Sequence, residues 1–269
     1  MQRLADHAYE RRIALFGGAY SNWVATDAVV SHAKRQNVED IWFLGDVGGF
    51  GAYPDRTVEV LVGGQVKAIQ GNYDHSVGQG LEDCGCGYSD PMDNYYADIS
   101  YRYTLEASSA ATRTWMRELG PPTIVTIGAQ RVLLCHGSPR RVNEFLWEST
   151  TPVGYVSHLC RLFGVDLIVC THTGLHWQRH GPDGTGIVNV GAVGRPANDG
   201  RLAAWYTLLE ATPNGIRGTF VPVHYDAAPV IAAMNDVGLP QLFADTLATG
   251  WWTTCLETLP SRERSRGRH

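Results

Sequence analysis

Short apolar runs alternate along the chain with turns rich in Gly, Asp, Asn or His, and these turns lead into helical patterns. The runs RIALF (12–16), DIWFLG (40–45) and QVKAIQG (65–71) predict the first three strands. Residues 22–36 and 55–63, which lie between them, have the pattern of helices. Because strand–helix–strand connections imply parallel pairing, we expect the loops at the carboxyl ends of these strands to meet at one edge of a sheet.

The rest of the chain continues this alternation. Residues 106–119 have an amphipathic helical pattern, and 123–128 with 130–137 predict a hairpin turned at Gly128-Ala129. Further elements are expected as a helix near 152–163, strands at 165–172, 186–191, 202–209 and 216–223, and helical structure over 226–248. No internal repeat or low-complexity linker interrupts the sequence, so we expect a single domain over residues 1–260 and a basic flexible tail, SRERSRGRH (261–269).

A long polar and aromatic segment, residues 72–104, includes CGCGYSDPMDNYY. A loop of this length inside a compact domain is typically functional, so we expect a lid or wall over a site. Cys84 and Cys86 flank a glycine there, and their spacing leaves open a metal role, a redox role or none. The start of the chain lacks the apolar core of a signal peptide, which predicts a cytoplasmic protein with all six cysteines as thiols.

The overall charge narrows the classes of ligand. With a formal net charge of −5 over 269 residues, the chain lacks the basic excess typical of proteins that bind nucleic acids. No segment approaches the roughly 20 apolar residues of a membrane-spanning helix. We therefore expect a small-molecule anionic substrate, whose binding requires a local positive centre such as a metal ion. The sequence leaves open whether the chain forms a homo-oligomer.

Four predicted strand ends carry residues that bind metals in proteins. Asp46 lies in FLGDVGG, Asn72 in IQGNYDH, His136 in LLCHGSP and His172 in IVCTHTG. Each residue alone is more often a cap or a hydrogen-bonded structural residue. At one edge of a sheet, however, a carboxylate, an amide oxygen and two imidazoles can together surround one divalent cation.

Six motifs follow one another in a characteristic order: GAY (18–20), GD (45–46), GNYD (71–74), HGSP (136–139), THTG (171–174) and NVGAVGRP (189–196). In this order, spacing and strand context, residues 12–225 resemble the calcineurin-like metallophosphoesterases, in particular their small bacterial branch. The resemblance implies an α/β fold, a four-layer α/β/β/α sandwich of two mixed sheets flanked by helices. It also implies a two-metal site at the edge where the loops gather.

The resemblance predicts that the first of the two metal sites is degenerate. The ligands of this site in the family map onto Gly18, Tyr20, Asp46 and Gly174, so three of the four are missing here. With one metal, the bridge between two cations is lost, although a Lewis acid remains.

The second metal site is complete by the same comparison. Its ligands map onto Asp46, Asn72, His136 and His172, and all four are present. We therefore expect a divalent metal such as Mn, Fe or Zn, with one per chain rather than two.

The catalytic residues implied by the resemblance also differ from the family pattern. Tyr73 replaces the histidine that serves as the acid, and a phenol with an ordinary pKa near 10 suits proton donation at neutral pH less well than imidazole. Asp74, which orients that histidine in the family, is retained. Arg195 in the GRP motif either binds a substrate anion or is a surface arginine that holds a loop.

Two further residues leave alternatives open. His176 is a candidate catalytic residue that a bulge could return to the vacated first site, and its alternative is a ring stacked beside Trp177 on the surface. Tyr20 either contacts the substrate or fills the vacated space. The adjacent Trp251 and Trp252 are either a packing plug or an apolar wall over a ligand.

The function favoured by these residues is hydrolysis of a small phosphate ester or related anion by a metal-bound water. One alternative is a pseudoenzyme whose metal is structural or senses a ligand. Another is a non-phosphatase reaction at a rebuilt Fe or Zn centre near Cys84 and Cys86.

Overall fold

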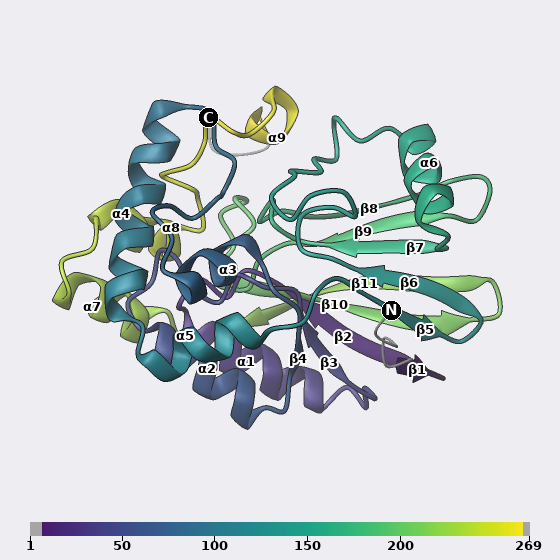
Figure 1. Cartoon of the computed structure of the whole chain (residues 1–269), viewed down its shortest axis with the longest axis horizontal. Coiled ribbons are helices and arrows are strands. Elements are labelled where there is room, and N and C mark those ends of the chain that lie inside the picture. Colours follow the sequence, from purple (N-terminus) through teal and green to yellow (C-terminus); the bar gives the residue numbers. More distant parts are fainter. Residues whose placement is uncertain (1–6, 266–269) are drawn as a thin grey trace.

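The computed structural model describes residues 7–265, which form two stacked mixed sheets with helices on their outer faces (Figure 1). The six-stranded sheet has the order β1 (His7–Tyr9), β5 (Thr123–Ile127), β6 (Gln130–Leu134), β7 (Leu167–Cys170), β9 (Gly186–Val190) and β8 (His176–His180). The five-stranded sheet has the order β11 (Gly215–His224), β10 (Ala203–Thr212), β2 (Arg12–Phe16), β3 (Ile41–Phe43) and β4 (Lys67–Ala68). The expected α/β sandwich of two mixed sheets is confirmed.

The helices lie in three places. In Figure 1, α1 (Trp23–Lys34) and α2 (Pro54–Gly63) cover the five-stranded sheet, and α6 (Val153–Phe163) covers the six-stranded sheet. The remaining helices lie near the left end of the sheets or above it: α3 (Asn72–Gln79), α4 (Pro91–Ala107), α5 (Ala110–Glu118), α7 (Ala228–Asp236), α8 (Gln241–Thr249) and α9 (Ser261–Ser265).

Successive residues on the strands face different layers, which is the basis of the sandwich. On β2, Ile13 and Leu15 pack between the two sheets, whereas Ala14 and Phe16 pack in the core shared with α1 and α2. Strand β7 alternates in the same way, with its outer face packed against α6. The near-continuous apolar runs of the sequence are therefore strands buried on both faces.

Parallel pairing holds for β2, β3 and β4 in one sheet and for β6, β7 and β9 in the other. The carboxyl ends of β3 and β4 thus lie at one end of the five-stranded sheet, and those of β6 and β7 at one end of the six-stranded sheet. The predicted ligands come from both sheets rather than from a single one.

One prediction about local structure is wrong, one strand was not predicted, and the first part of the predicted tail is helical. Residues 72–104 are not one long loop, because they contain α3 and most of α4, whose Asp90 side chain accepts hydrogen bonds from the first-turn N–H groups of Met92 and Asp93. Residues 176–180 form β8, which pairs antiparallel with β9. The tail begins with α9, in which Glu263 is buried and accepts hydrogen bonds from the N–H and hydroxyl of Ser149; residues 266–269 lie outside the described chain.

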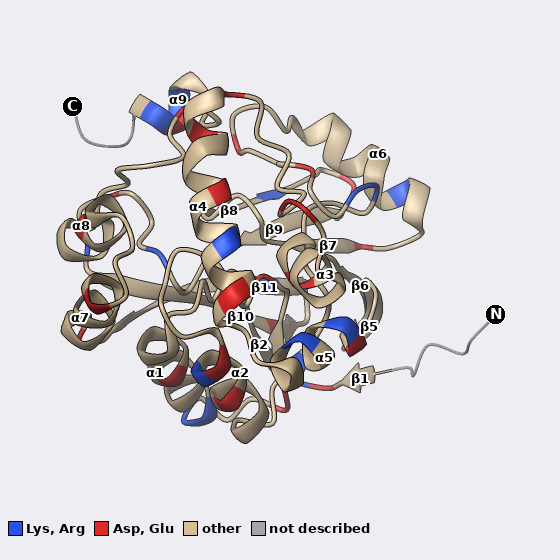
Figure 2. Ribbon diagram, turned by 60° about the vertical axis from the view of Figure 1, so that its left-hand side comes forward, with Lys and Arg blue, Asp and Glu red and all other residues tan. Residues whose placement is uncertain are grey.

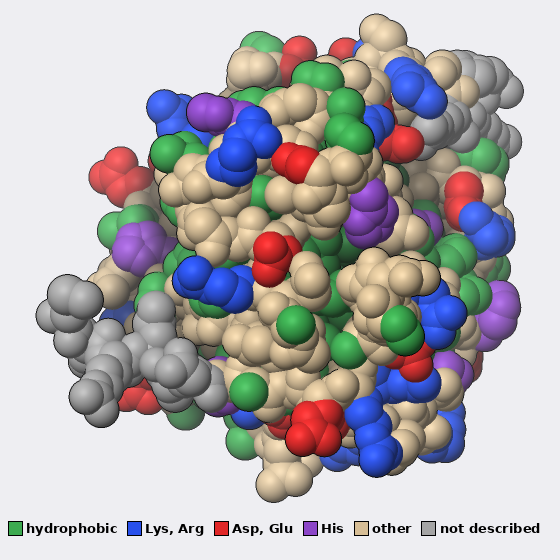
Figure 3. Space-filling view, turned by 90° about the vertical axis from the view of Figure 1, so that its right-hand side faces the viewer, with side chains coloured by type: hydrophobic (Ala, Val, Ile, Leu, Met, Phe, Trp, Pro, Cys, Tyr) green, Lys and Arg blue, Asp and Glu red, His purple; other side chains and the backbone are tan. Residues whose placement is uncertain are grey.

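Charged side chains of both signs are intermixed on the surface. Figure 2 shows blue and red positions interspersed over the helices, and the face in Figure 3 likewise has no large area of one sign. Within residues 7–265, no helix is long and apolar enough to cross a membrane.

Candidate metal centre

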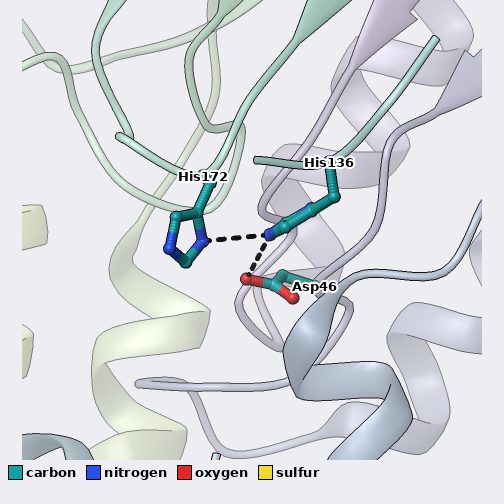
Figure 4. Close-up of side chains that lie close together, drawn as sticks. All are labelled: Asp46, His136 and His172. Atoms are coloured by element: carbon teal, nitrogen blue, oxygen red, sulfur yellow. Dashed lines mark hydrogen bonds and ion pairs between the residues drawn. The ribbon is translucent and has the colours of Figure 1, made fainter. Parts of the chain in front are cut away.

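Asp46, His136 and His172 converge at the ends of strands from both sheets (Figure 4). Asp46 follows β3, His136 follows β6 and His172 follows β7. One ligand atom from each residue lies within 4.8 Å of the others, and all three residues are buried. His136 Nε2 is 3.1 Å from Asp46 Oδ2 and 3.1 Å from His172 Nδ1. Three of the four predicted ligands are therefore brought together.

Two backbone carbonyls fix how the imidazole rings use their nitrogens. His136 Nδ1 lies 2.6 Å from the carbonyl oxygen of Leu44, and His172 Nε2 lies 3.2 Å from that of Cys86. A carbonyl oxygen only accepts, so these two nitrogens donate. His136 Nε2 and His172 Nδ1 then face each other, and His136 Nε2 also faces the Asp46 carboxylate. Despite burial, Asp46 raises the pKa of His136, so a proton on Nε2 can link these groups, and a cation would take the place of that proton. A cation satisfies the lone pairs of all three groups at once.

The charges of the group suit a cation as well. Burial opposes ionisation of Asp46, but the two imidazoles keep the pKa of this carboxyl below its ordinary value. Burial and the adjacent His136 lower the pKa of His172 to about 3, so this ring is neutral at neutral pH. A carboxylate beside a neutral imidazole is the protonation state in which these residues bind metals.

Asn72, the fourth predicted ligand, lies at the start of α3 and is buried. Its Nδ2 donates to the carbonyl oxygen of Cys84 at 2.8 Å, and this bond fixes which end of the amide is the oxygen. Oδ1 is buried and has no hydrogen-bond partner among the described residues. A buried amide oxygen without a partner is rare in folded proteins and is compatible with a ligand role.

The backbone at two of these residues is strained. Asp46 has φ of 67° and His172 has φ of 69°, in the left-handed region that non-glycine residues rarely adopt. Gly71 lies so close to Asp46 that a Cβ there would be 2.3 Å from Oδ1 of Asp46. Backbone strain of this kind is often found at functional sites, where the surrounding structure holds it in place.

Asp74 holds the strained loops together. Its carboxylate accepts hydrogen bonds from the backbone N–H groups of Asp46 (2.8 Å), Val47 (2.9 Å) and Gly71 (2.9 Å). Asp46 Oδ1 in turn accepts from the N–H of Tyr73 at 3.0 Å, which leaves its other oxygen toward His136. Asp74 is therefore a positioning residue in this structure, bonded to the backbone rather than to a side chain at position 73.

A small cavity of about 20 Å³ adjoins the group, which is room for about one water molecule. Asp46 and His172 line it together with four aromatic side chains, Tyr20, Phe50, Tyr73 and Tyr88. The hydroxyl of Tyr73 lies 2.9 Å from that of Ser100 on α4, and burial raises the pKa of Tyr73 above its ordinary value. The phenol thus keeps its proton at neutral pH. The aromatic walls formed by Phe50 and Tyr88 had no distinctive pattern in the sequence.

Comparison with known proteins identifies the family. Residues 12–212 match the model of the calcineurin-like phosphoesterase superfamily domain. The chain belongs to this superfamily. An uncharacterized protein of Methanocaldococcus jannaschii is 26% identical over 254 residues, covering 88% of this chain and 98% of that protein.

One solved structure agrees with this assignment, and a second has the same fold. The crystal structure of a metallophosphoesterase from Sphaerobacter thermophilus is similar with a TM-score of 0.69 and 27% identity, over 90% of this chain and 99% of that one. A hypothetical protein from Pyrococcus horikoshii has a similar fold, with a TM-score of 0.74 and 20% identity over the same shares of the two chains.

Aromatic rings lie against Gly18 and Gly174, two of the positions that the sequence resemblance assigns to a first metal site. A Cβ at Gly18 would lie 2.8 Å from the ring of Tyr20, and a Cβ at Gly174 would lie 2.9 Å from the ring of Trp252. Trp252 is buried, and its Nε1 donates to the carbonyl oxygen of Pro196 at 2.7 Å. Trp252 is thus a packing residue at this edge.

Arg195 lies among the same rings. Its guanidinium carbon is 4.1 Å from the ring centre of Trp252 and 4.9 Å from that of Phe50, and the residue is only 6% exposed. Nη2 donates to the carbonyl oxygen of Thr254 at 2.6 Å. The alternative of a surface arginine is excluded, because the guanidinium is buried and stacked.

His176 does not join the group. It begins β8, and its ring centre lies 4.3 Å from that of Trp205 and 4.7 Å from that of Phe220. Its Nδ1 is buried without a hydrogen-bond partner among the described residues. Neither predicted arrangement is found: the ring lies between strand side chains rather than in the site or beside Trp177.

Cys84 and Cys86 also differ from expectation, because they form a disulfide, whereas Cys135, Cys160, Cys170 and Cys255 are free. The prediction of six thiols is therefore wrong for residues 84–86, which we call the CGC segment. That segment lies in the connection between α3 and α4, and its carbonyl oxygens accept hydrogen bonds from Asn72 and His172, two of the candidate ligands.

Proposed function

We propose that the protein is a hydrolase of a small phosphate ester or related anion that binds one divalent cation through Asp46, Asn72, His136 and His172. The observation that supports this most strongly is the convergence of Asp46 Oδ2, His136 Nε2 and His172 Nδ1 at buried strand ends. The unpartnered Oδ1 of Asn72 is the fourth donor. Nitrogen and oxygen donors suit Mn, Fe or Zn.

The side chains present favour one cation per chain. Gly18, Tyr20 and Gly174 offer none of the carboxylate and imidazole ligands of the first site, and the rings of Tyr20 and Trp252 lie against the two glycines. When bound at the remaining site, a divalent cation supplies Lewis-acid stabilisation of a phosphoryl oxygen and lowers the pKa of water.

Arg195 supplies a second positive charge for an anionic substrate. A guanidinium keeps its charge at any physiological pH, and one stacked between Phe50 and Trp252 is oriented with little remaining freedom. Phe50, on whose ring the guanidinium of Arg195 stacks, also lines the cavity, so the guanidinium lies next to it. We infer that Arg195 binds substrate oxygens, with Tyr20 beside it. Tyr73 holds its proton and contributes a hydroxyl to the cavity wall.

A second candidate function is a pseudoenzyme whose cation is structural or senses a ligand. The small size of the cavity favours it, because a volume of about 20 Å³ admits a water molecule but no phosphate ester unless the aromatic walls move. Turnover and metal content separate the two candidates.

The test combines elemental analysis with a phosphatase screen. The purified protein is loaded separately with Mn²⁺, Fe²⁺ and Zn²⁺ and assayed on small phosphomonoesters and phosphodiesters. We expect one metal per chain and slow turnover, with both lost in Asp46→Asn. The control is Asp98→Asn, which alters an exposed carboxylate paired with Arg102 on α4. One bound metal without turnover of any ester supports the pseudoenzyme, and protein without bound metal contradicts both candidates.

A further inference from the structure

The CGC segment contacts the metal-binding residues directly. The carbonyl oxygen of Cys84 accepts from Nδ2 of Asn72 at 2.8 Å, and the carbonyl oxygen of Cys86 accepts from Nε2 of His172 at 3.2 Å. The carbonyl oxygen of Gly85 accepts from Nδ2 of Asn143 at 2.8 Å, which ties the segment to the loop that follows β6. Two of the four proposed ligands are thus oriented by this one segment.

The sulfur of Cys86 lies next to the same residues. It is 3.6 Å from Nδ2 of Asn72, and Cys86 lines the cavity that Asp46 and His172 also line. Cys86 and Cys84 are both buried. Cys84 is absent from the residues that line this cavity, so Cys86 is the cysteine of the pair that borders it. While the disulfide is closed, the sulfur of Cys86 contacts Nδ2 of Asn72 and is not among the converging ligand atoms, so it must turn toward them once the disulfide opens.

We propose that Cys86 is a redox-dependent ligand of the cation: it is withheld while bonded to Cys84 and binds once a dithiol reductant opens the disulfide. The inference rests on the proposed cation site. In the oxidised protein, the donors are the carboxylate, the amide oxygen and the two imidazoles. In the reduced protein, a thiolate joins them, which strengthens binding of Zn²⁺ and other metals that prefer sulfur.

The redox step balances without a further reactant. A dithiol gives two electrons and two protons to the Cys84–Cys86 disulfide and is itself oxidised to a disulfide, which leaves two thiols on the chain. On binding a divalent cation, the Cys86 thiol releases its proton to solvent and forms the sulfur–metal bond. Gly85, with φ of 59°, gives the segment a backbone that can accommodate either state.

Cobalt(II) is the probe for the test, because a thiolate bound to Co²⁺ produces a charge-transfer absorption in the near ultraviolet that oxygen and nitrogen ligands do not. The full chain is titrated with Co²⁺ twice, once oxidised and once after reduction by dithiothreitol and its removal without air. We expect the charge-transfer band in the reduced protein alone, with affinity about tenfold or more above that of the oxidised protein.

Three variants test whether the sulfur that binds the cation belongs to Cys86. Cys84→Ser leaves Cys86 without its partner, so the band should appear without reduction. Cys86→Ser should lack the band in either state, and Cys160→Ser, which alters a buried free cysteine elsewhere, should behave like the unaltered chain. Circular dichroism confirms folding of each variant, and the comparison of oxidised with reduced unaltered protein needs no variant.

Each outcome has a definite meaning. If reduced protein binds Co²⁺ without the charge-transfer band, or if the band persists in folded Cys86→Ser, the ligand role of Cys86 is wrong while the cation site stands. If neither redox state binds Co²⁺, or any of Zn²⁺, Mn²⁺ and Fe²⁺ in parallel titrations, the cation site itself is wrong and the inference fails with it.

Discussion

His176 should make the folded chain sensitive to acid without taking part in catalysis. Its ring is packed against Trp205 and Phe220, and burial lowers its pKa from 6.5 to about 4; Asp199 opposes this shift and Arg201 adds to it. The folded state therefore takes up this proton less readily than the unfolded chain. The stabilising effect of the neutral ring is complete above pH 6.5 and is lost as the pH falls toward 4.

The size of the effect follows from the two pKa values of His176. A pKa of 6.5 in the unfolded chain and about 4 in the folded chain lower the free energy of unfolding by about 2 kcal/mol between pH 7.5 and pH 5. Replacing His176 by Phe keeps a flat ring between the same aromatic side chains and removes the titrating group. Nδ1 of His176 has no hydrogen-bond partner among the described residues, so no bond at this atom is lost.

Urea unfolding followed by circular dichroism between pH 5 and 7.5 measures this difference. As the pH falls from 7.5 to 5, the free energy of unfolding of the unaltered chain should decrease by about 2 kcal/mol more than that of His176→Phe. A variant at the exposed His158, His158→Gln, should follow the unaltered chain. His176→Phe should also retain its metal and its turnover. Parallel loss of stability in the unaltered chain and His176→Phe, or loss of metal in the variant, would refute this account of His176.

Three other substitutions test the site and its supports. Gly71→Ala places a Cβ 2.3 Å from Oδ1 of Asp46. We therefore expect the free energy of unfolding, measured in urea, to fall by about 1–3 kcal/mol, and metal binding, measured by calorimetry, to weaken. Arg195→Met keeps an apolar side chain between the rings but removes the charge, so steady-state kinetics should show a higher KM for anionic esters with metal content unchanged. Glu263→Gln removes the negative charge that accepts two hydrogen bonds from Ser149. Thermal unfolding should show that the free energy of unfolding falls by about 1–2 kcal/mol.

Matched substitutions serve as controls for these three. Gly63→Ala in α2 adds a Cβ with nothing within 4 Å and should leave stability equal or higher. Arg161→Met and Glu106→Gln alter exposed side chains and should change KM and stability little. The reasoning is contradicted if Gly71→Ala is as harmless as Gly63→Ala, if Arg195→Met leaves KM unchanged, or if Glu263→Gln matches Glu106→Gln.

The ligand positions could be predicted because they follow from strand ends. The strands before Asp46, His136 and His172 are short apolar runs buried on both faces, and such runs are distinctive in a sequence. Their parallel pairing then places the following residues at a common end. The order of the motifs along the chain also matched that of the family. The structure brings three of the four predicted ligands together.

What could not be predicted depends on contacts between distant segments. Strand β8, with the sequence HWQRH, contains a single apolar residue, Trp177, so no run marks it as a strand, and His176 was assigned to the wrong surroundings. The Asp90-Pro91 pair that starts α4 is a helix signal, but the polar and aromatic residues around it hid the helix. The filling of the space beside Gly174 by Trp252 joins segments 78 residues apart, which no local pattern encodes.

Anomalous X-ray diffraction from crystals grown with Mn²⁺ tests the central claim most directly. The account predicts one anomalous peak per chain, within bonding distance of Oδ2 of Asp46, Nε2 of His136 and Nδ1 of His172. No peak between these atoms would contradict the cation site. Two peaks about 3.5–4 Å apart would contradict the proposal of one cation per chain.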